Sequence, residues 1–256
     1  MIVRVTIAIA ATAALAACTS AQQQRISRDR RAATEFLEHE GSVGDPGRVA
    51  AADIAFAKMA REEGQWTAFG EYAAPGAVIH GRNGPILAQP WLAQLTDPEL
   101  AVSWTPNRVW SSCDGTLAVT FGRFQEPTGE VGSYVSVWEL QSDNSYKYTY
   151  DMGALDDPQP ARQPGEDIPE GAIVVPGMAS IQGRIADCPA EGESVPLPPQ
   201  RISDSGAASD TVRSEDGTLE WTWTHGEDGE RRFAAHWLRD GAWSEAVELV
   251  VPPGGE

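Results

Sequence analysis

The sequence lacks the usual signatures of metal binding and has few basic residues. No Cys-x-x-Cys, His-x-His or His-Glu-x-x-His spacing occurs, and the four histidines lie far apart along the chain. We therefore predict no metal and no cofactor. Lysine and arginine total 19 against 37 aspartate and glutamate residues, which gives a formal net charge of −18. Because a chain this acidic repels phosphate backbones, its charge argues against a nucleic-acid-binding protein.

Long hydrophobic runs are also scarce. The apolar run at residues 5–17 follows Arg4 and is too short to span a bilayer as a helix, which is typical of a secretory signal peptide. The run ends in Leu-Ala-Ala-Cys at residues 15–18, which resembles a bacterial lipobox. That resemblance implies a signal peptide at 1–17 and a lipid on Cys18. Thr19, where an aspartate would signal inner-membrane retention, favours the outer membrane. We expect a lipid-anchored, periplasm-facing protein of the bacterial cell envelope.

Cysteine is rare as well, with three in the chain. Once Cys18 is acylated, Cys113 and Cys188 remain, in a compartment that permits disulfides. A Cys113–Cys188 bridge and two separate buried thiols both stay open at this point.

The predicted secondary structure changes from helices to strands along the chain. After residues 18–44, predicted as a tether and a first helix, Asp45 caps a helix, Pro46 takes its first position and Gly64 ends it. Period-two strand patterns follow from residue 101. Helices followed by a strand meander predict an α+β domain at 45–153. A Pro-rich and acidic linker at 154–172 separates it from a C-terminal β extension at 173–256.

Residues 132–153, "GSYVSVWELQSDNSYKYTYDMG", predict a β-hairpin with a loop at 142–144. This loop places Glu139 opposite Lys147 and Trp138 opposite Tyr148, which are both favourable cross-strand pairs. Strict alternation then puts Asp151 across from Val135, away from the aromatic face. Alternation separates the two faces of the hairpin but does not tell which of them lines a cavity.

Residues 45–153 resemble the SnoaL-like bacterial branch of the nuclear transport factor 2-like superfamily. The resemblance is carried by "ADIAF" at 52–56, "WTP" at 104–106 and the hairpin at 132–153. It implies a curved, mostly antiparallel sheet wrapped around helices, which forms a cone with an apolar cavity. Some members of that superfamily are isomerases, dehydratases or cyclases, and many others only bind ligands or proteins.

Three residues are candidates for acid–base chemistry. Asp53 lies on an otherwise apolar helical stripe, so it is either a paired structural acid or a cavity acid with a raised pKa. His80 is either a general base, as the family comparison implies, or a histidine at the rim. Asp151 points into the cavity only if its face of the sheet is the concave one.

Five further residues are candidates for lining the cavity: Trp104, Tyr134, Trp138, Tyr150 and Arg82. Packing in the core is the alternative for the aromatic residues, and solvation is the alternative for Arg82. We predict a protein that binds a small apolar molecule and compare it with two alternatives, an acid–base lyase or isomerase and a protein-interaction module. A homodimer is compatible with the sequence.

Overall fold

The computed structural model describes residues 43–160, 180–190, 192–198 and 208–255. Gly44–Glu256 form one compact unit. The predicted signal peptide, Cys18, the tether and the first helix lie outside the described residues, as does most of the predicted linker. None of the helices in the described part of the chain is long and apolar enough to cross a membrane.

Three helices lie in the described part of the chain, all of them before residue 93. They are α2 (Pro46–Glu63), α3 (Gln65–Tyr72) and α4 (Ala88–Leu92). The predicted limits of α2 are confirmed. Asp45 Oδ1 accepts hydrogen bonds from the backbone N–H groups of Gly47 and Arg48 at 3.0 and 3.1 Å. Gly64 ends the helix with a φ of 121°, in the region that favours glycine.

Seven strands form the first sheet, in the order β2-β1-β6-β5-β4-β3-β7. Their bounds are β1 Ala73–Gly81, β2 Gly84–Leu87, β3 Ser103–Ser111, β4 Leu117–Gln125, β5 Val131–Leu140, β6 Tyr146–Leu155 and β7 Gln182–Ile185. The sheet is mixed, because β1 pairs with β6 and β3 pairs with β7 in parallel. The central meander β3–β6 is antiparallel.

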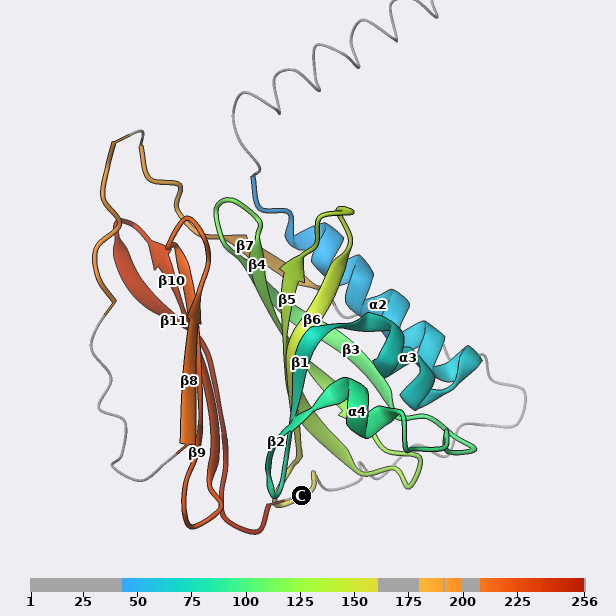
Figure 1. The fold of residues 1–256 in the computed structure, drawn as a ribbon. Helices are drawn as coiled ribbons and strands as arrows, with labels where there is room; N and C mark the ends of the chain where they lie inside the picture. Colours follow the sequence, from blue (N-terminus) through green and yellow to red (C-terminus); the bar gives the residue numbers. More distant parts are fainter. Residues whose placement is uncertain (1–42, 161–179, 191, 199–207, 256) are drawn as a thin grey trace, which may run out of the picture. The chain divides into compact units, whose positions relative to one another are not determined.

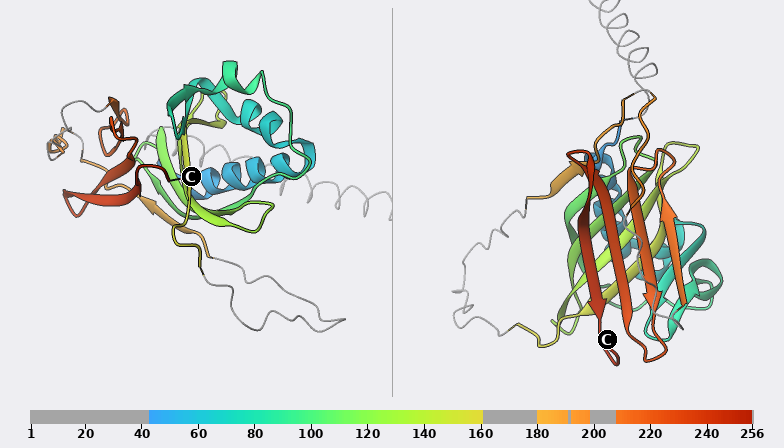
Figure 2. Two further views of the ribbon diagram at one scale, coloured as in Figure 1. Left: turned by 90° about the horizontal axis from the view of Figure 1, so that it is seen from below. Right: turned by 90° about the vertical axis from the view of Figure 1, so that its left-hand side faces the viewer.

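Four later strands form a second, antiparallel sheet, in the order β11-β10-β9-β8. Their bounds are β8 Ala208–Arg213, β9 Leu219–His225, β10 Arg231–Arg239 and β11 Ala242–Val251. Figure 1 shows this sheet on one side of the first sheet and the three helices on the other. The right-hand view in Figure 2 shows the four strands side by side in front of the larger sheet.

The first sheet is therefore buried on both faces, with a separate core on each. One core joins it to the helices and contains Phe56, Trp138 and Tyr148. The other joins it to the second sheet and contains Tyr150 and Phe233. The burial of β5 follows from this, since Tyr134–Trp138 are buried without alternation.

The predicted fold class is wrong. An α+β cone, with a curved sheet wrapped around helices, was expected from the helix-then-strand order and from the family resemblance. The described residues instead form a mostly β structure, with a seven-stranded mixed sheet, a four-stranded sheet and three helices. The physical reason is that the C-terminal residues add a strand, β7, to the first sheet and cover its second face with a whole sheet.

The two sheets meet through a repeated turn that the sequence analysis did not identify. Ser-x-Asp-Gly-Thr-Leu occurs at 112–117, between β3 and β4, and again at 214–219, between β8 and β9. In each turn a serine hydroxyl donates to the aspartate at 2.6 Å. The backbone N–H of Asp114 donates to Asp216 at 2.8 Å, and that of Asp216 donates to Asp114 at 3.1 Å. This reciprocal pair of hydrogen bonds joins the two meanders at equivalent positions.

Candidate ligand-binding cavity

A cavity of about 540 Å³ lies between the helices and the first sheet. Its wall is rich in aromatic side chains, which come from α2, α3, α4, β3 and β4: Phe56, Trp66, Phe69, Trp91, Trp104 and Phe124. Its polar groups include Tyr134 on β5 and Asp151 on β6. An apolar cavity with a few convergent polar groups is the usual form of a small-molecule site.

Asp53 lies behind this wall and is fully buried. Trp104 Nε1 donates to its Oδ1 at 2.9 Å, and the Tyr134 hydroxyl donates to its Oδ2 at 3.1 Å. Burial raises the pKa of Asp53 to about 6, although hydrogen bonds from Thr120, Trp104 and Tyr134 act in the opposite direction. Its two donors Trp104 and Tyr134 line the cavity. The structure therefore places Asp53 as the acceptor that holds two cavity residues in position.

Asp151 lines the cavity itself. Ser136 Oγ donates to its Oδ2 at 2.5 Å. Burial raises the pKa of Asp151 to about 7; the Ser136 hydrogen bond lowers it, and the charge of Asp53 raises it further. A carboxyl group with a pKa near neutrality can both give and take a proton at physiological pH.

A β-bulge explains why Asp151 faces the cavity. The hairpin pairs Glu139 with Lys147 and Trp138 with Tyr148, as the loop predicted. The register then shifts, so that Tyr150 pairs with Val137 and Asp151 pairs with Ser136. The expected position of Asp151 across from Val135 is therefore wrong. An extra residue in one strand moves the following side chains to the opposite faces.

The same shift divides the predicted aromatic face. Tyr148 and Trp138 pack in the helix-side core, where Trp138 Nε1 donates to Thr120 Oγ1 at 3.1 Å. Tyr150 packs against the second sheet, with its ring centroid 5.5 Å from that of Phe233. Of the predicted lining residues, Trp104 and Tyr134 line the cavity, whereas Trp138 and Tyr150 are core residues.

His80 is 1% exposed and lies away from the cavity, between the two sheets, where it contacts His225 and Trp223 of β9. Its Nδ1 is 2.7 Å from the Tyr150 hydroxyl and its Nε2 is 3.0 Å from His225 Nδ1. Burial, together with the nearby charges of His225 and Arg231, lowers the pKa of His80 to about 4. His80 is thus a neutral structural histidine at neutral pH. It does not lie beside Asp151 or Tyr134 in the cavity wall.

The remaining predicted residues lie outside the cavity. Arg82 is exposed in the turn between β1 and β2. Cys113 and Cys188 form a disulfide, with Cα atoms 5.1 Å apart. Cys18 lies outside the described residues. In the described ranges, no group of three or more His, Cys, Asp or Glu side chains is placed to hold a metal ion.

Several residues of the cavity were missed from the sequence. Ser136 does not line the cavity but donates to Asp151, and its position two residues after Tyr134 on β5 puts both side chains on the same face. Gln65 also lines the cavity, and its Oε1 accepts a hydrogen bond from the backbone N–H of Val102 at 2.9 Å. Glu126 and Glu130 lie at the rim, in the turn between β4 and β5. No local pattern marks a turn glutamate as part of a cavity.

Comparisons with known proteins identify no family for this chain. No family profile matches it, and no curated protein matches it. Among solved structures it is similar to a protein of unknown function with a cystatin-like fold from Methylobium petroleophilum PM1. The two are 11% identical, the match covers 55% of this chain and 86% of that chain, and the TM-score is 0.33. A similarity this weak carries no argument about fold or function, and the SnoaL-like resemblance stays a prediction.

Proposed function

We propose that this protein binds a small, mostly apolar molecule in the cavity between the helices and the first sheet. The observation that carries the proposal is the aromatic wall around about 540 Å³, into which few polar groups point. That volume is typical of small-molecule sites in proteins. Asp53 supports the same function, because it fixes the side chains of Trp104 and Tyr134 through hydrogen bonds.

Titration with the neutral fluorescent probe N-phenyl-1-naphthylamine tests this proposal. Val102 lines the cavity, and Leu100, two residues earlier, is 66% exposed and lies outside the lining set. Val102→Trp fills part of the cavity, whereas Leu100→Trp adds the same side chain at the surface. We expect saturable binding to the wild type and to Leu100→Trp, and at least about a tenfold loss, or about 1.4 kcal/mol, in Val102→Trp. Equal binding by both variants would contradict the proposal.

Mass spectrometry of protein purified from its native envelope identifies the ligand. Small molecules released on denaturation from the wild type and from Leu100→Trp, and depleted from Val102→Trp, are the candidates. This comparison separates a ligand of the cavity from lipids that adhere to the surface.

A second candidate function is acid–base catalysis on a ligand in the same cavity. Asp151 favours it, because a carboxyl group with a pKa of about 7 lines the cavity near Tyr134. Asp53, which accepts from two cavity residues, suits the role of base less well than Asp151. Exchange of protons next to a ketone, followed by NMR in D₂O, is the test. We expect faster exchange with wild type than with Asp151→Asn, and wild-type exchange at the buffer rate would exclude this function for the ketones used.

A third hypothesis, the protein-interaction module, depended on an open aromatic patch in residues 219–249. Trp221, Phe233 and Trp237 are buried there and belong to the core between the sheets. These rings thus stabilise the packing of the second sheet, and nothing in them favours this hypothesis.

A further inference from the structure

The ionisable side chains that line the cavity are all acids. They are Asp151, Glu126, Glu130 and the phenol of Tyr134, and the described lining residues include no lysine, arginine or histidine. We propose that the ligand is a cation, namely an ammonium group attached to an apolar, aromatic-sized body. This inference rests on the proposed function, because it specifies the chemical class of the molecule that the cavity binds.

The two rim glutamates are held close together by the turn that carries them. The backbone N–H of Glu126 donates to the backbone oxygen of Glu130 at 2.8 Å. Burial raises the pKa of Glu126, and the charge of Glu130 raises it further. Repulsion between two like charges is relieved when a cation binds beside them. The rim therefore favours a positively charged ligand over a neutral one of the same shape.

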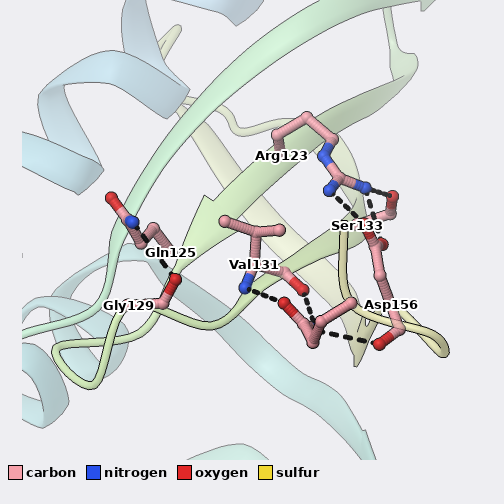
Figure 3. Close-up of polar contacts among 7 residues, drawn as sticks. Arg123, Gln125, Gly129, Val131, Ser133 and Asp156 are labelled. Carbon is pink, nitrogen blue, oxygen red and sulfur yellow. Dashed lines mark hydrogen bonds and ion pairs between the residues drawn. The ribbon is translucent and has the colours of Figure 1, made fainter. Parts of the chain in front are cut away.

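The nearest arginine on β4 does not offset these charges. Arg123 precedes Phe124, which lines the cavity, but its guanidinium forms an ion pair with Asp156 and donates to Ser133 at 2.6 Å (Figure 3). Figure 3 also shows Val131, at the start of β5, held by separate hydrogen bonds beside this pair. Arg123 is thus neutralised by its own carboxylate partner.

A second hollow, of about 500 Å³, adjoins the first and is also acidic. The two share Glu130, Ala154 and Leu155, and the second is lined further by Asp157 and by Asp156, whose charge is balanced by Arg123. Glu130 therefore lies where the two hollows meet. A carboxylate at that point attracts a cation that enters from either of them.

The aromatic wall suits the same ligand. Trp66, Trp91 and Trp104 line the cavity, and tryptophan is the side chain whose ring face attracts cations most strongly. Trp66 and Trp91 pack at 68° to each other, with centroids 5.5 Å apart. An anionic head group gains nothing from the ring faces and is repelled by the carboxylates, and a neutral ligand gains only from apolar burial.

Three probes with one naphthyl skeleton test the inference: 2-(2-naphthyl)ethylammonium, 2-(2-naphthyl)ethanol and 2-naphthylacetate. We expect the ammonium probe to bind at least about tenfold more tightly than the alcohol, which corresponds to about 1.4 kcal/mol, and the carboxylate most weakly. The preference should shrink as salt rises from about 0.05 M to about 0.5 M, because exposed charges are screened. Binding of the ammonium probe should also release protons, since the cation favours the ionised form of Asp151.

Matched variants test whether the carboxylates of the cavity cause the preference for the ammonium probe. Glu126→Gln should reduce ammonium affinity several-fold and leave alcohol affinity unchanged, whereas Glu99→Gln, which removes one charge from an exposed glutamate outside the cavity, should change neither. Ammonium binding that survives Val102→Trp is attraction to the acidic surface and overturns the inference. Equal binding of the alcohol and the ammonium probe, both lost in Val102→Trp, overturns the inference while the proposed function stands. If none of the three probes binds, both fail.

Discussion

At the scale of single residues, the buried carboxylate of Asp53 holds two residues of the cavity wall in position, although Asp53 does not line the cavity itself. An unpaired buried charge costs several kcal/mol, so Asp53 persists because its oxygens are satisfied by side chains of the first sheet. Thr120 belongs to the same network, because it accepts from Trp138 and hydrogen-bonds Asp53. The network connects the helix-side core to two residues of the cavity wall.

Removal of this acceptor should destabilise the protein. We expect Asp53→Ala to lower the free energy of unfolding by about 2–4 kcal/mol, because the buried donors of Trp104 and Tyr134 lose their partner. Asp53→Asn keeps a side-chain acceptor for Trp104 and should cost less than half as much. Urea unfolding of the three proteins measures both values. Equal stability of Asp53→Ala and wild type would show that these hydrogen bonds contribute nothing net.

At the scale of secondary structure elements, strand β1 meets the second sheet through His80. The groups that face this side chain are Tyr150 from β6, His225 from β9 and Arg231 from β10. Arg231 is itself buried, and its Nη1 donates to the backbone oxygen of His80 at 3.1 Å. A proton added to His80 would therefore place a second positive charge near Arg231, inside the core that joins the sheets.

This contact should make the stability depend on pH. The folded pKa of His80, about 4, lies below its usual value of 6.5, so the folded state binds fewer protons than the unfolded state between these values. The contribution of His80 is present above pH 6.5 and is lost as the pH falls toward 4, by on the order of 3 kcal/mol. We expect His80→Asn to cost more stability at about pH 7.5 than at about pH 4.5, measured by urea unfolding.

The stability of His80→Asn must be compared with that of the wild type at each pH, because titration of Asp53 and Asp151 changes the stability of both proteins in the opposite direction. Their folded pKa values, about 6 and about 7, lie above the usual 3.8, so they add stability as the pH falls through that range. Tyr150→Phe keeps both histidines and should retain the pH dependence of the wild type. A cost of His80→Asn that is the same at both pH values would contradict the assignment of His80 as the group responsible.

The disulfide acts between elements too, since it ties the turn after β3 to the segment that follows β7. It joins positions separated by 75 residues, and loop-closure entropy puts its stabilisation on the order of 4 kcal/mol. We expect reductant to lower the urea midpoint of protein lacking residues 1–18. Reductant should have no effect on the matched double variant Cys113→Ala/Cys188→Ala. An unchanged wild-type midpoint would mean that the bridge adds no stability.

At the scale of the whole molecule, the anchor at Cys18 stays a prediction from the signal and the lipobox. Lipid on this residue, rather than charge, would hold a protein of net charge −18 at a membrane. We expect the wild type to incorporate labelled fatty acid in its native host, and Cys18→Ala to lose the label and leave the membrane fraction or stay unprocessed. Absence of label in the wild type would contradict lipidation.

Local features of this protein could be predicted because their causes are local. The limits of α2 follow from Asp45, Pro46 and Gly64, and the pairing of Trp138 with Tyr148 follows from a three-residue loop. Each depends on residues a few positions apart, so the sequence by itself determined them. The proximity of Cys113 to Cys188 could only be raised as one of two alternatives.

Only the tertiary structure decided which face of a strand lines the cavity and which face packs in a core. Alternation has a period of two, so the register shift before Tyr150 was enough to turn Asp151 toward the cavity and Tyr150 away from it. The second sheet decided the rest, since its four strands bury a whole face of the first sheet. Both outcomes depend on packing between segments far apart in the chain, and no periodicity within one segment encodes such packing.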